Sequence, residues 1–231
     1  MNLILVARSA DRLEEVAEHI RQVADVEVEV LPADLSQAEG TLRVCERLID
    51  DERPVGLLVN NAGFGLGQDF VGGDIERELN ALNVMVRAVL MTCHAAIPGM
   101  VARGGGGILN IASMAALTAQ GTYSAHKAWV RTFTEGLAAS LKGTGVNATV
   151  VCPGLVHTEF HEKVDVDPGQ WPESAFIPAE RVAAEAIEGV RRGKVVVTPS
   201  RRYRALAGAL KVAPRSLVRA VAGPERSGRR G

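Results

Sequence analysis

The chain has 231 residues, of which 47% are hydrophobic and 23% are charged, and its formal net charge is −1. This composition is typical of one globular domain with a sizeable core, and it excludes a disordered or fibrous chain. Only 4% of the residues are aromatic, which argues against the stacking platforms that bind nucleic acid. No uninterrupted apolar run reaches the roughly 18 residues that cross a bilayer. No signal segment is recognisable at the start, so a cytoplasmic location is expected.

Apolar patterns predict an alternation of strands and helices. Residues 3–7 form a short continuous apolar run, as expected for a parallel strand buried on both faces, and Ser9 can cap the helix that follows. The predicted strands span 3–7, 26–31, 55–59, 108–112, 146–152 and 194–198. The predicted helices span 10–24, 37–50, 75–100, 122–141 and 180–191. This alternation indicates βαβ units, so we predict an α/β fold with a Rossmann-like, doubly wound parallel sheet in a single domain.

The distribution of charge distinguishes the C-terminal residues from the rest of the chain. Residues 201–231 hold nine Lys and Arg against one acidic residue, Glu225. We therefore expect a domain over residues 1–200 and a basic tail over residues 201–231. The tail should form two short amphipathic helices broken at Pro214, followed by a disordered end. It is expected to pack near the substrate mouth or a partner subunit, and contact with an anionic membrane surface is the alternative.

The three cysteines are consistent with the expected cytoplasmic location. Three cysteines stand in apolar contexts without the spacing of a metal site: Cys45, Cys93 and Cys152. Buried free thiols in a reducing compartment are expected. His157 and His161 are four residues apart, but nothing completes a ligand set around them, so no metal is predicted.

A tyrosine and a lysine in the helix at 122–141 suggest acid/base chemistry. Tyr123 and Lys127 are four residues apart and therefore share a helix face. A nearby ammonium favours the phenolate and is expected to lower the Tyr123 pKa from about 10. Ser113 follows the strand at 108–112, at the carboxyl edge where open α/β sheets bind ligands. Taken alone, the pair could instead be a packed tyrosine beside a solvated lysine.

The surrounding motifs decide between these interpretations. In chain order they are Asp34-Leu35, Asn60-Asn61-Ala62-Gly63, Asn83, Asn110-Ile111-Ala112-Ser113, Tyr123-Ser124-Ala125-His126-Lys127, and Pro153-Gly154 with Thr158. In that order, over roughly residues 3–198, the chain resembles the short-chain dehydrogenase/reductase family.

The resemblance implies an oxidoreductase that interconverts a ketone, or a 3-oxoacyl group, and a secondary alcohol with a nicotinamide cofactor. Tyr123 would be the acid/base and Ser113 would orient the carbonyl oxygen. Lys127 would lower the Tyr123 pKa and hold the nicotinamide ribose. Asn83 would be the fourth catalytic member, positioning a water through a helix distortion, whereas alone it would be a surface or capping amide.

Arg8 bears on the choice of cofactor. It ends the first predicted strand, where the adenosine ribose lies in this fold, and Arg accommodates the 2′-phosphate of NADP whereas an acidic residue would bind the 2′-hydroxyl of NAD. NADP(H) is therefore predicted over NAD(H), and Ser9 could add a hydrogen bond to the phosphate. The alternative is a solvated cation at a strand end. The other cofactor contacts implied by the resemblance are Asp34, Leu35, Asn60, Ala62, Gly63, Tyr123, Lys127, Pro153, Gly154, Val156 and Thr158.

One family feature has no counterpart in the sequence. The family's Gly-rich turn, Thr-Gly-x-x-x-Gly-x-Gly, belongs to a first βα unit, and Met1 stands just before what resembles the second strand. The missing strand would lie between the strands at 3–7 and 55–59, so two unpaired edges are expected there. Either the start is placed too far downstream, or the chain is a true truncation. In the second case it would be a catalytically inactive remnant that serves as a binding protein.

The remaining segments predict a class of substrate and an oligomeric state. Leu155–Phe176 is expected to be a substrate lid, and its aromatic residues favour an apolar carbonyl or alcohol substrate. The family commonly forms homodimers or homotetramers through the helices that resemble those at 75–100 and 122–141.

Overall fold

The computed structural model describes residues 1–156 and 172–222. Its strands are β1 (Leu3–Ala7), β2 (Val28–Pro32), β3 (Leu57–Asn60), β4 (Gly106–Ile111), β5 (Val146–Val151) and β6 (Val196–Val197). Its α-helices are α1 (Ala10–Val23), α2 (Ala38–Leu48), α3 (Ile75–Leu82), α4 (Ala88–Ala102), α5 (Thr122–Ser140), α7 (Ala179–Arg191), α8 (Arg201–Val212) and α9 (Arg215–Ala222). A π-helical turn η1 (Asn83–Arg87) and two 3₁₀ turns, η2 (Met114–Leu117) and η4 (Glu173–Ala175), complete the described elements. Each predicted strand and helix is present, with ends shifted by a few residues.

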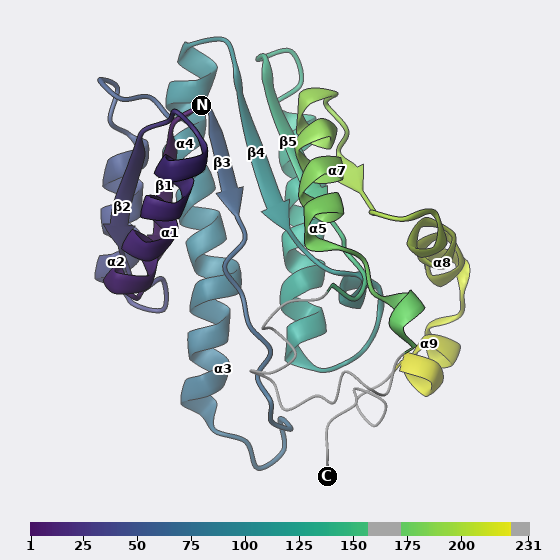
Figure 1. The fold of residues 1–231 in the computed structure, drawn as a ribbon. Helices are drawn as coiled ribbons and strands as arrows, with labels where there is room; N and C mark the ends of the chain where they lie inside the picture. Colours follow the sequence, from purple (N-terminus) through teal and green to yellow (C-terminus); the bar gives the residue numbers. More distant parts are fainter. Residues whose placement is uncertain (157–171, 223–231) are drawn as a thin grey trace.

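The strands form two parallel sheets placed side by side (Figure 1). β1 pairs with β2, and the larger sheet has the order β3-β4-β5-β6. Helices α2, α4 and α5 lie on one face, and α1 and α7 lie on the other (Figure 1). The α/β, doubly wound parallel architecture is as predicted. Within the described residues β1 and β3 do not pair, so the two unpaired edges expected there are present.

Apolar residues beside these edges are less buried than those in the middle of the large sheet. Val59 of β3 is 47% exposed, whereas Ile108 of β4 and Val150 of β5 are 0% exposed. Strands of a parallel sheet are normally buried on both faces. Within the described residues, the apolar surface at the β3 edge is therefore only partly covered.

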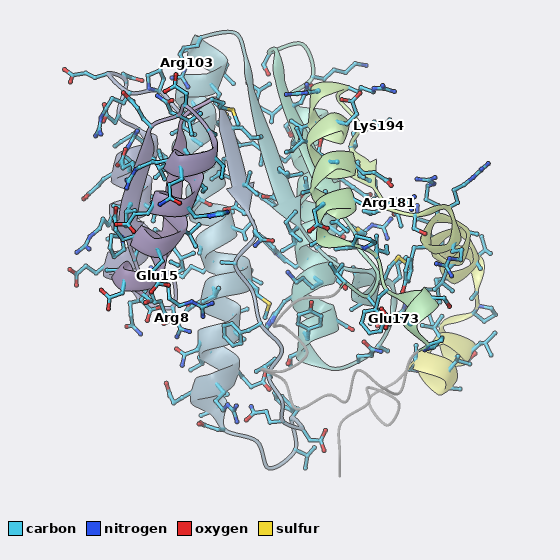
Figure 2. The ribbon with its side chains drawn as sticks, viewed as in Figure 1. Arg8, Glu15, Arg103, Glu173, Arg181 and Lys194 are labelled. Atoms are coloured by element: carbon cyan, nitrogen blue, oxygen red, sulfur yellow. The ribbon has the colours of Figure 1, made fainter. Side chains whose placement is uncertain are left out.

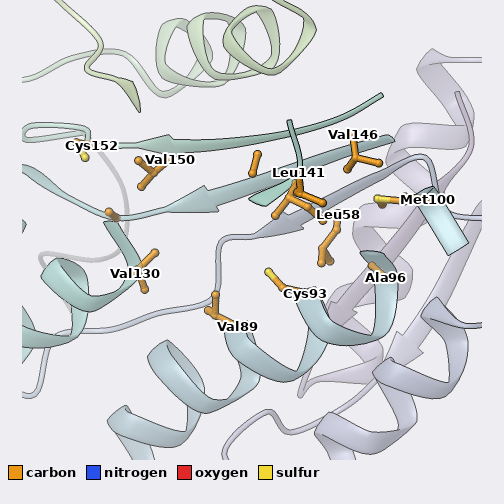
Figure 3. Close-up of a cluster of buried hydrophobic side chains, with 13 residues drawn as sticks. Leu58, Val89, Cys93, Ala96, Met100, Val130, Leu141, Val146, Val150 and Cys152 are labelled. Carbon is orange, nitrogen blue, oxygen red and sulfur yellow. The ribbon is translucent and has the colours of Figure 1, made fainter. Parts of the chain in front are cut away.

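The main core lies between the large sheet and helices α4 and α5 (Figure 3). Met100 from α4 and Val130 from α5 pack with Ile108 and Val150 of the sheet, and each of the four is 2% exposed or less. Because α5 is fixed to β4 and β5 by this core, its first turn is held at the carboxyl edge of the sheet.

The predicted helix at 75–100 is one helical rod with a local distortion. Its hydrogen bonding becomes π-helical at Asn83–Arg87, between α3 and α4. Such π-bulges occur frequently at functional sites. Among the described residues, Ile75–Ala102 is long and apolar enough to span a membrane by length and composition alone. Its Val89, Cys93 and Ala96 pack into the core beneath the sheet, as in the core helix of a globular domain.

Candidate active site

Ser113 and Tyr123 meet at the carboxyl end of β4. Ser113 caps η2, because its Oγ accepts a hydrogen bond from the amide of Ala115 at 3.1 Å. Gly121, with φ of 79°, turns the chain into α5, and Tyr123 lies in the first turn of that helix. The Ser113 and Tyr123 side chains are hydrogen-bonded to each other. Two residues from different elements thus bring their hydroxyl groups together.

Lys127 lies one turn further along α5 and is only 5% exposed. Its Nζ donates a hydrogen bond to the carbonyl oxygen of Ile111 at 2.8 Å and lies 5.8 Å from the centre of the Tyr123 ring. The turn after β3 is close to the same ammonium, since a Cβ built on Gly63 would be 3.3 Å from Nζ. The structure therefore brings Ser113, Tyr123 and Lys127 together, as the sequence predicted, and it places Gly63 beside Lys127, which the sequence did not predict.

The expected lowering of the Tyr123 pKa was wrong for this structure. Burial raises the pKa of Tyr123 to about 12, and the hydrogen bond with Ser113 opposes this shift only in part. Burial also lowers the pKa of Lys127 to about 8. The loss of hydration of the phenolate is therefore the dominant effect on the Tyr123 pKa. In this structure Tyr123 is a neutral phenol at physiological pH.

Asn83 is the first residue of the π-helical turn, so the predicted helix distortion is present at this residue. Its side-chain Nδ2 donates to the carbonyl oxygen of Ser36 at 3.1 Å. Ser36 in turn donates from its amide and its hydroxyl to Oδ1 of Asp34, at 2.9 and 2.8 Å. Asn83 therefore supports the turn after β2. Sequence reasoning missed Ser36, although Asp-x-Ser is the spacing of a side-chain-to-backbone turn.

Asn60 is held in a buried polar network. Its Nδ2 donates to Oδ1 of Asn110 at 2.9 Å, and its Oδ1 accepts from the Thr92 hydroxyl at 2.9 Å. Asn110, which is 0% exposed, donates to the Thr134 hydroxyl at 2.9 Å. The network joins β3, β4, α4 and α5 beneath the site. The two threonines gave no sequence signal because they occupy ordinary helix positions.

The other predicted cofactor-binding residues lie directly after the carboxyl ends of strands. Arg8 and Ser9 follow β1, and Figure 2 shows Arg8 at the carboxyl end of that strand. Ser9 caps α1, as predicted, by accepting from the amide of Arg12 at 3.4 Å. The rest lie after β2, β3 and β5: Asp34, Leu35, Ala62, Gly63, Pro153, Gly154 and Val156. Thr158, with His157 and His161, lies outside the described residues.

The sequence that carries this Ser-Tyr-Lys group matches a known family. The sequence model described as short chain dehydrogenase matches residues 1–168 of the chain. The chain belongs to the short-chain dehydrogenase family. This short-chain dehydrogenase is therefore an oxidoreductase that acts on CH–OH groups with a nicotinamide dinucleotide.

Relatives and solved structures agree with this assignment. An uncharacterized oxidoreductase of Staphylococcus saprophyticus is 32% identical over 185 residues, which are 76% of this chain and 79% of that protein. Sulfoacetaldehyde reductase 2 of Chromohalobacter salexigens is 34% identical over 69% of this chain and 64% of its own length.

Two solved structures show the same fold. A short-chain dehydrogenase from Sphingobium yanoikuyae in complex with NADPH is similar at 31% identity, with a TM-score of 0.81 over 91% of this chain and 84% of that one. A bulky-bulky ketone specific alcohol dehydrogenase from Comamonas testosteroni is similar at 26% identity, with a TM-score of 0.77 over 91% and 82% of the two chains.

Proposed function

We propose that this short-chain dehydrogenase interconverts a ketone, or a 3-oxoacyl group, and the secondary alcohol, with Tyr123 as acid/base. The observation that supports it is the hydrogen bond between the Ser113 and Tyr123 side chains beside the buried Lys127. A proton donor and an orienting hydroxyl at the carboxyl edge of a parallel sheet are what carbonyl reduction requires.

Each of the three residues has a distinct role in the proposal. A nicotinamide held by Lys127 and the loop after β5 would supply hydride for the carbonyl carbon. Tyr123, protonated because its pKa is about 12, gives its proton to the carbonyl oxygen as that oxygen gains negative charge. Ser113 orients the oxygen by hydrogen bonding. Lys127, cationic below its pKa of about 8, stabilises the phenolate that remains.

The residues present fit the two ends of a dinucleotide. At the adenosine end, Arg8 is an exposed cation and Asp34 lies in the turn after β2. At the nicotinamide end, Gly154 and Val156 follow β5, and Lys127 would hold the ribose. A Gly-rich turn for the pyrophosphate is not among the 231 residues. We assign Arg8, Ser9, Asp34, Leu35, Asn60, Ala62, Gly63, Tyr123, Lys127, Pro153, Gly154, Val156 and Thr158 to cofactor binding.

The preference for NADP(H) is proposed from Arg8, with support from the NADPH-bound relative. Replacing this guanidinium by a carboxylate, in Arg8→Asp, should weaken NADPH binding by about 10- to 100-fold, because charge-assisted hydrogen bonds contribute ~1.5–3 kcal/mol. NADH affinity should stay the same or rise. Nicotinamide fluorescence titrations measure both. Lys194→Asp, at an exposed site on another side of the molecule, is the matched control (Figure 2). Equal losses for both nucleotides would contradict the assignment.

An apolar substrate is proposed from the surroundings of Tyr123. Its ring packs against a cluster that contains the buried Leu66 and Met85 and the partly buried Phe64. Such a wall favours a hydrophobic group next to the carbonyl. Consumption of NADPH with a series of ketones of increasing apolar size, followed by absorbance, tests the reaction. Rates that fall as apolar size increases would contradict the substrate class.

We also propose a homodimer or homotetramer formed through α3–α4 and α5. Leu79, Leu82 and Leu90 are between 41% and 46% exposed on the first surface, and Trp129 and Phe133 border a shallow groove on the second. Contiguous exposed apolar groups mark association sites. Light scattering after gel filtration should show an oligomer, and Leu90→Glu should shift it towards the monomer. Val23→Glu, at an exposed residue of α1, should not, and a monomeric wild-type chain would contradict the proposal.

A cytoplasmic location and an unanchored tail complete the proposal. The three cysteines are unpaired, as expected in a reducing compartment. Arg202, Arg204 and Arg215 of the tail donate hydrogen bonds to backbone carbonyls of the domain. Because these cations bind the protein itself, we do not propose membrane attachment.

A further inference from the structure

We propose that Tyr203, in the tail helix α8, is a positioning residue that holds the loop after β5 in its cofactor-binding form. The inference rests on the proposed function, because Gly154 and Val156 of that loop are assigned to the cofactor. Tyr203 stands 48 residues after Leu155, and its side chain reaches back over the loop. The tail thereby contributes to the site.

The Tyr203 hydroxyl joins the two ends of the segment between β5 and α7. It accepts a hydrogen bond from the amide of Leu155 at 3.2 Å and donates to the carbonyl oxygen of Ala175 at 2.9 Å. The carbonyl of Leu155 accepts from the amide of Ile177 at 2.9 Å. Both backbone polar groups of Leu155 are therefore fixed, one by a side chain of the tail and the other by the chain leading into α7.

The Tyr203 ring lies directly on Gly154. A Cβ built on Gly154 would be 2.1 Å from Cζ of the ring and 2.3 Å from both Cε atoms. Gly154 does not have a left-handed φ, so its backbone conformation does not require glycine. Glycine is required at this position because the Tyr203 ring leaves no space for a side chain. The ring and the glycine are thus one close-packed unit, and a methyl group on Gly154 must displace either the ring or the loop.

This packing is connected to the catalytic hydroxyls. The carbonyl oxygen of Pro153, next to Gly154, accepts from the amide of Met114 at 2.9 Å. Met114 follows Ser113, which is hydrogen-bonded to Tyr123. A shift of Gly154 therefore moves the acceptor that fixes the chain beside Ser113.

Helix α8 is itself firmly placed. It begins after Ser200, which has φ of 73° and is 6% exposed. A non-glycine residue in that conformation persists only where its surroundings fix it. Arg202 donates to the carbonyl of Ser174 at 2.5 Å, and Ala207 is buried. The helix is thus a firm support from which one side chain can hold the loop.

A double-mutant cycle tests the close packing of the Tyr203 ring on Gly154. Gly154→Ala should weaken NADPH binding by about 10-fold or more, because the methyl group meets the ring. In a Tyr203→Ala background, where the ring is gone, Gly154→Ala should change NADPH affinity by less than about 3-fold. The same loss in both backgrounds would overturn the proposal, since Gly154 would then be needed for the cofactor alone. Arg201→Ala, an exposed residue of α8, is the control and should bind as wild type.

Amide hydrogen exchange, measured in the absence of cofactor, tests the hydrogen bond between the Tyr203 hydroxyl and the Leu155 amide. Tyr203→Phe keeps the ring on Gly154 but leaves the Leu155 amide without its acceptor. Exchange of that amide should accelerate by about 10-fold or more, while the amide of Val150 in β5 keeps its protection. Unchanged exchange at Leu155 would overturn the proposal even if NADPH binds. Faster exchange in a chain that ignores NADPH would support the contact while refuting the proposed function.

Discussion

Tyr123→Phe should lower turnover of a ketone by about 10²- to 10⁴-fold, the range that general acid/base catalysis contributes. The variant loses only the hydroxyl, so the ring still packs with Leu66 and Met85. NADPH affinity should fall far less than turnover does, because the Tyr123 ring is kept and the lost hydroxyl acts on the substrate oxygen. Steady-state kinetics and a nicotinamide fluorescence titration separate the two effects.

The matched control for this variant is Ser113→Ala, which removes the partner hydroxyl and leaves the acid. It should reduce turnover less than Tyr123→Phe does, because Ser113 orients the oxygen but carries no transferred proton. A Tyr123→Phe enzyme that keeps more than about one-tenth of wild-type turnover would rule out Tyr123 as the acid.

Lys127→Met should abolish activity and change how stability depends on pH. Burial lowers the pKa of Lys127 from 10.5 to about 8 in the folded chain. Between these two values the unfolded chain binds more protons than the folded one, so wild-type stability rises with pH over that window. The free energy of unfolding of Lys127→Met, relative to wild type, should therefore fall by about 3 kcal/mol between pH 7 and pH 10.

Urea unfolding of both proteins at pH 7 and pH 10 measures that difference. The constant cost of leaving the Ile111 carbonyl without its donor cancels between the two pH values. Lys142→Met, on an exposed lysine, should show no such change with pH. A Lys127→Met effect equal at both values would show that the ammonium is hydrated rather than buried.

Local patterns were enough to predict the elements and the shared helix face of Tyr123 and Lys127, whereas the catalytic role of these residues was predicted from the family resemblance. Continuous apolar runs define β1 and β4, and the four-residue spacing places Tyr123 and Lys127 on one helix face. The π-helical turn could be expected only from the resemblance, because the sequence of 83–87 is ordinary for a helix. The pKa of Tyr123 could not be predicted, since desolvation depends on which residues close over the ring.

Contacts between residues far apart in the sequence could not be predicted either. Tyr203 looked like one apolar position of an amphipathic tail, and nothing near Gly154 in the sequence indicates that a ring lies on it. The side chain of Asn83 also reaches Ser36, 47 residues away, rather than a group near its own turn. Such partners are set by how the elements pack, which no local pattern records.

An NADPH titration of the 231-residue chain, with NADH alongside and a thermal unfolding curve of the same sample, tests the central claim most directly. An NADP(H)-dependent oxidoreductase predicts a cooperative unfolding transition and saturable binding of NADPH that is at least about 10-fold tighter than that of NADH. A chain that unfolds cooperatively but binds neither nucleotide would contradict the account, and would favour a binding protein built on this fold.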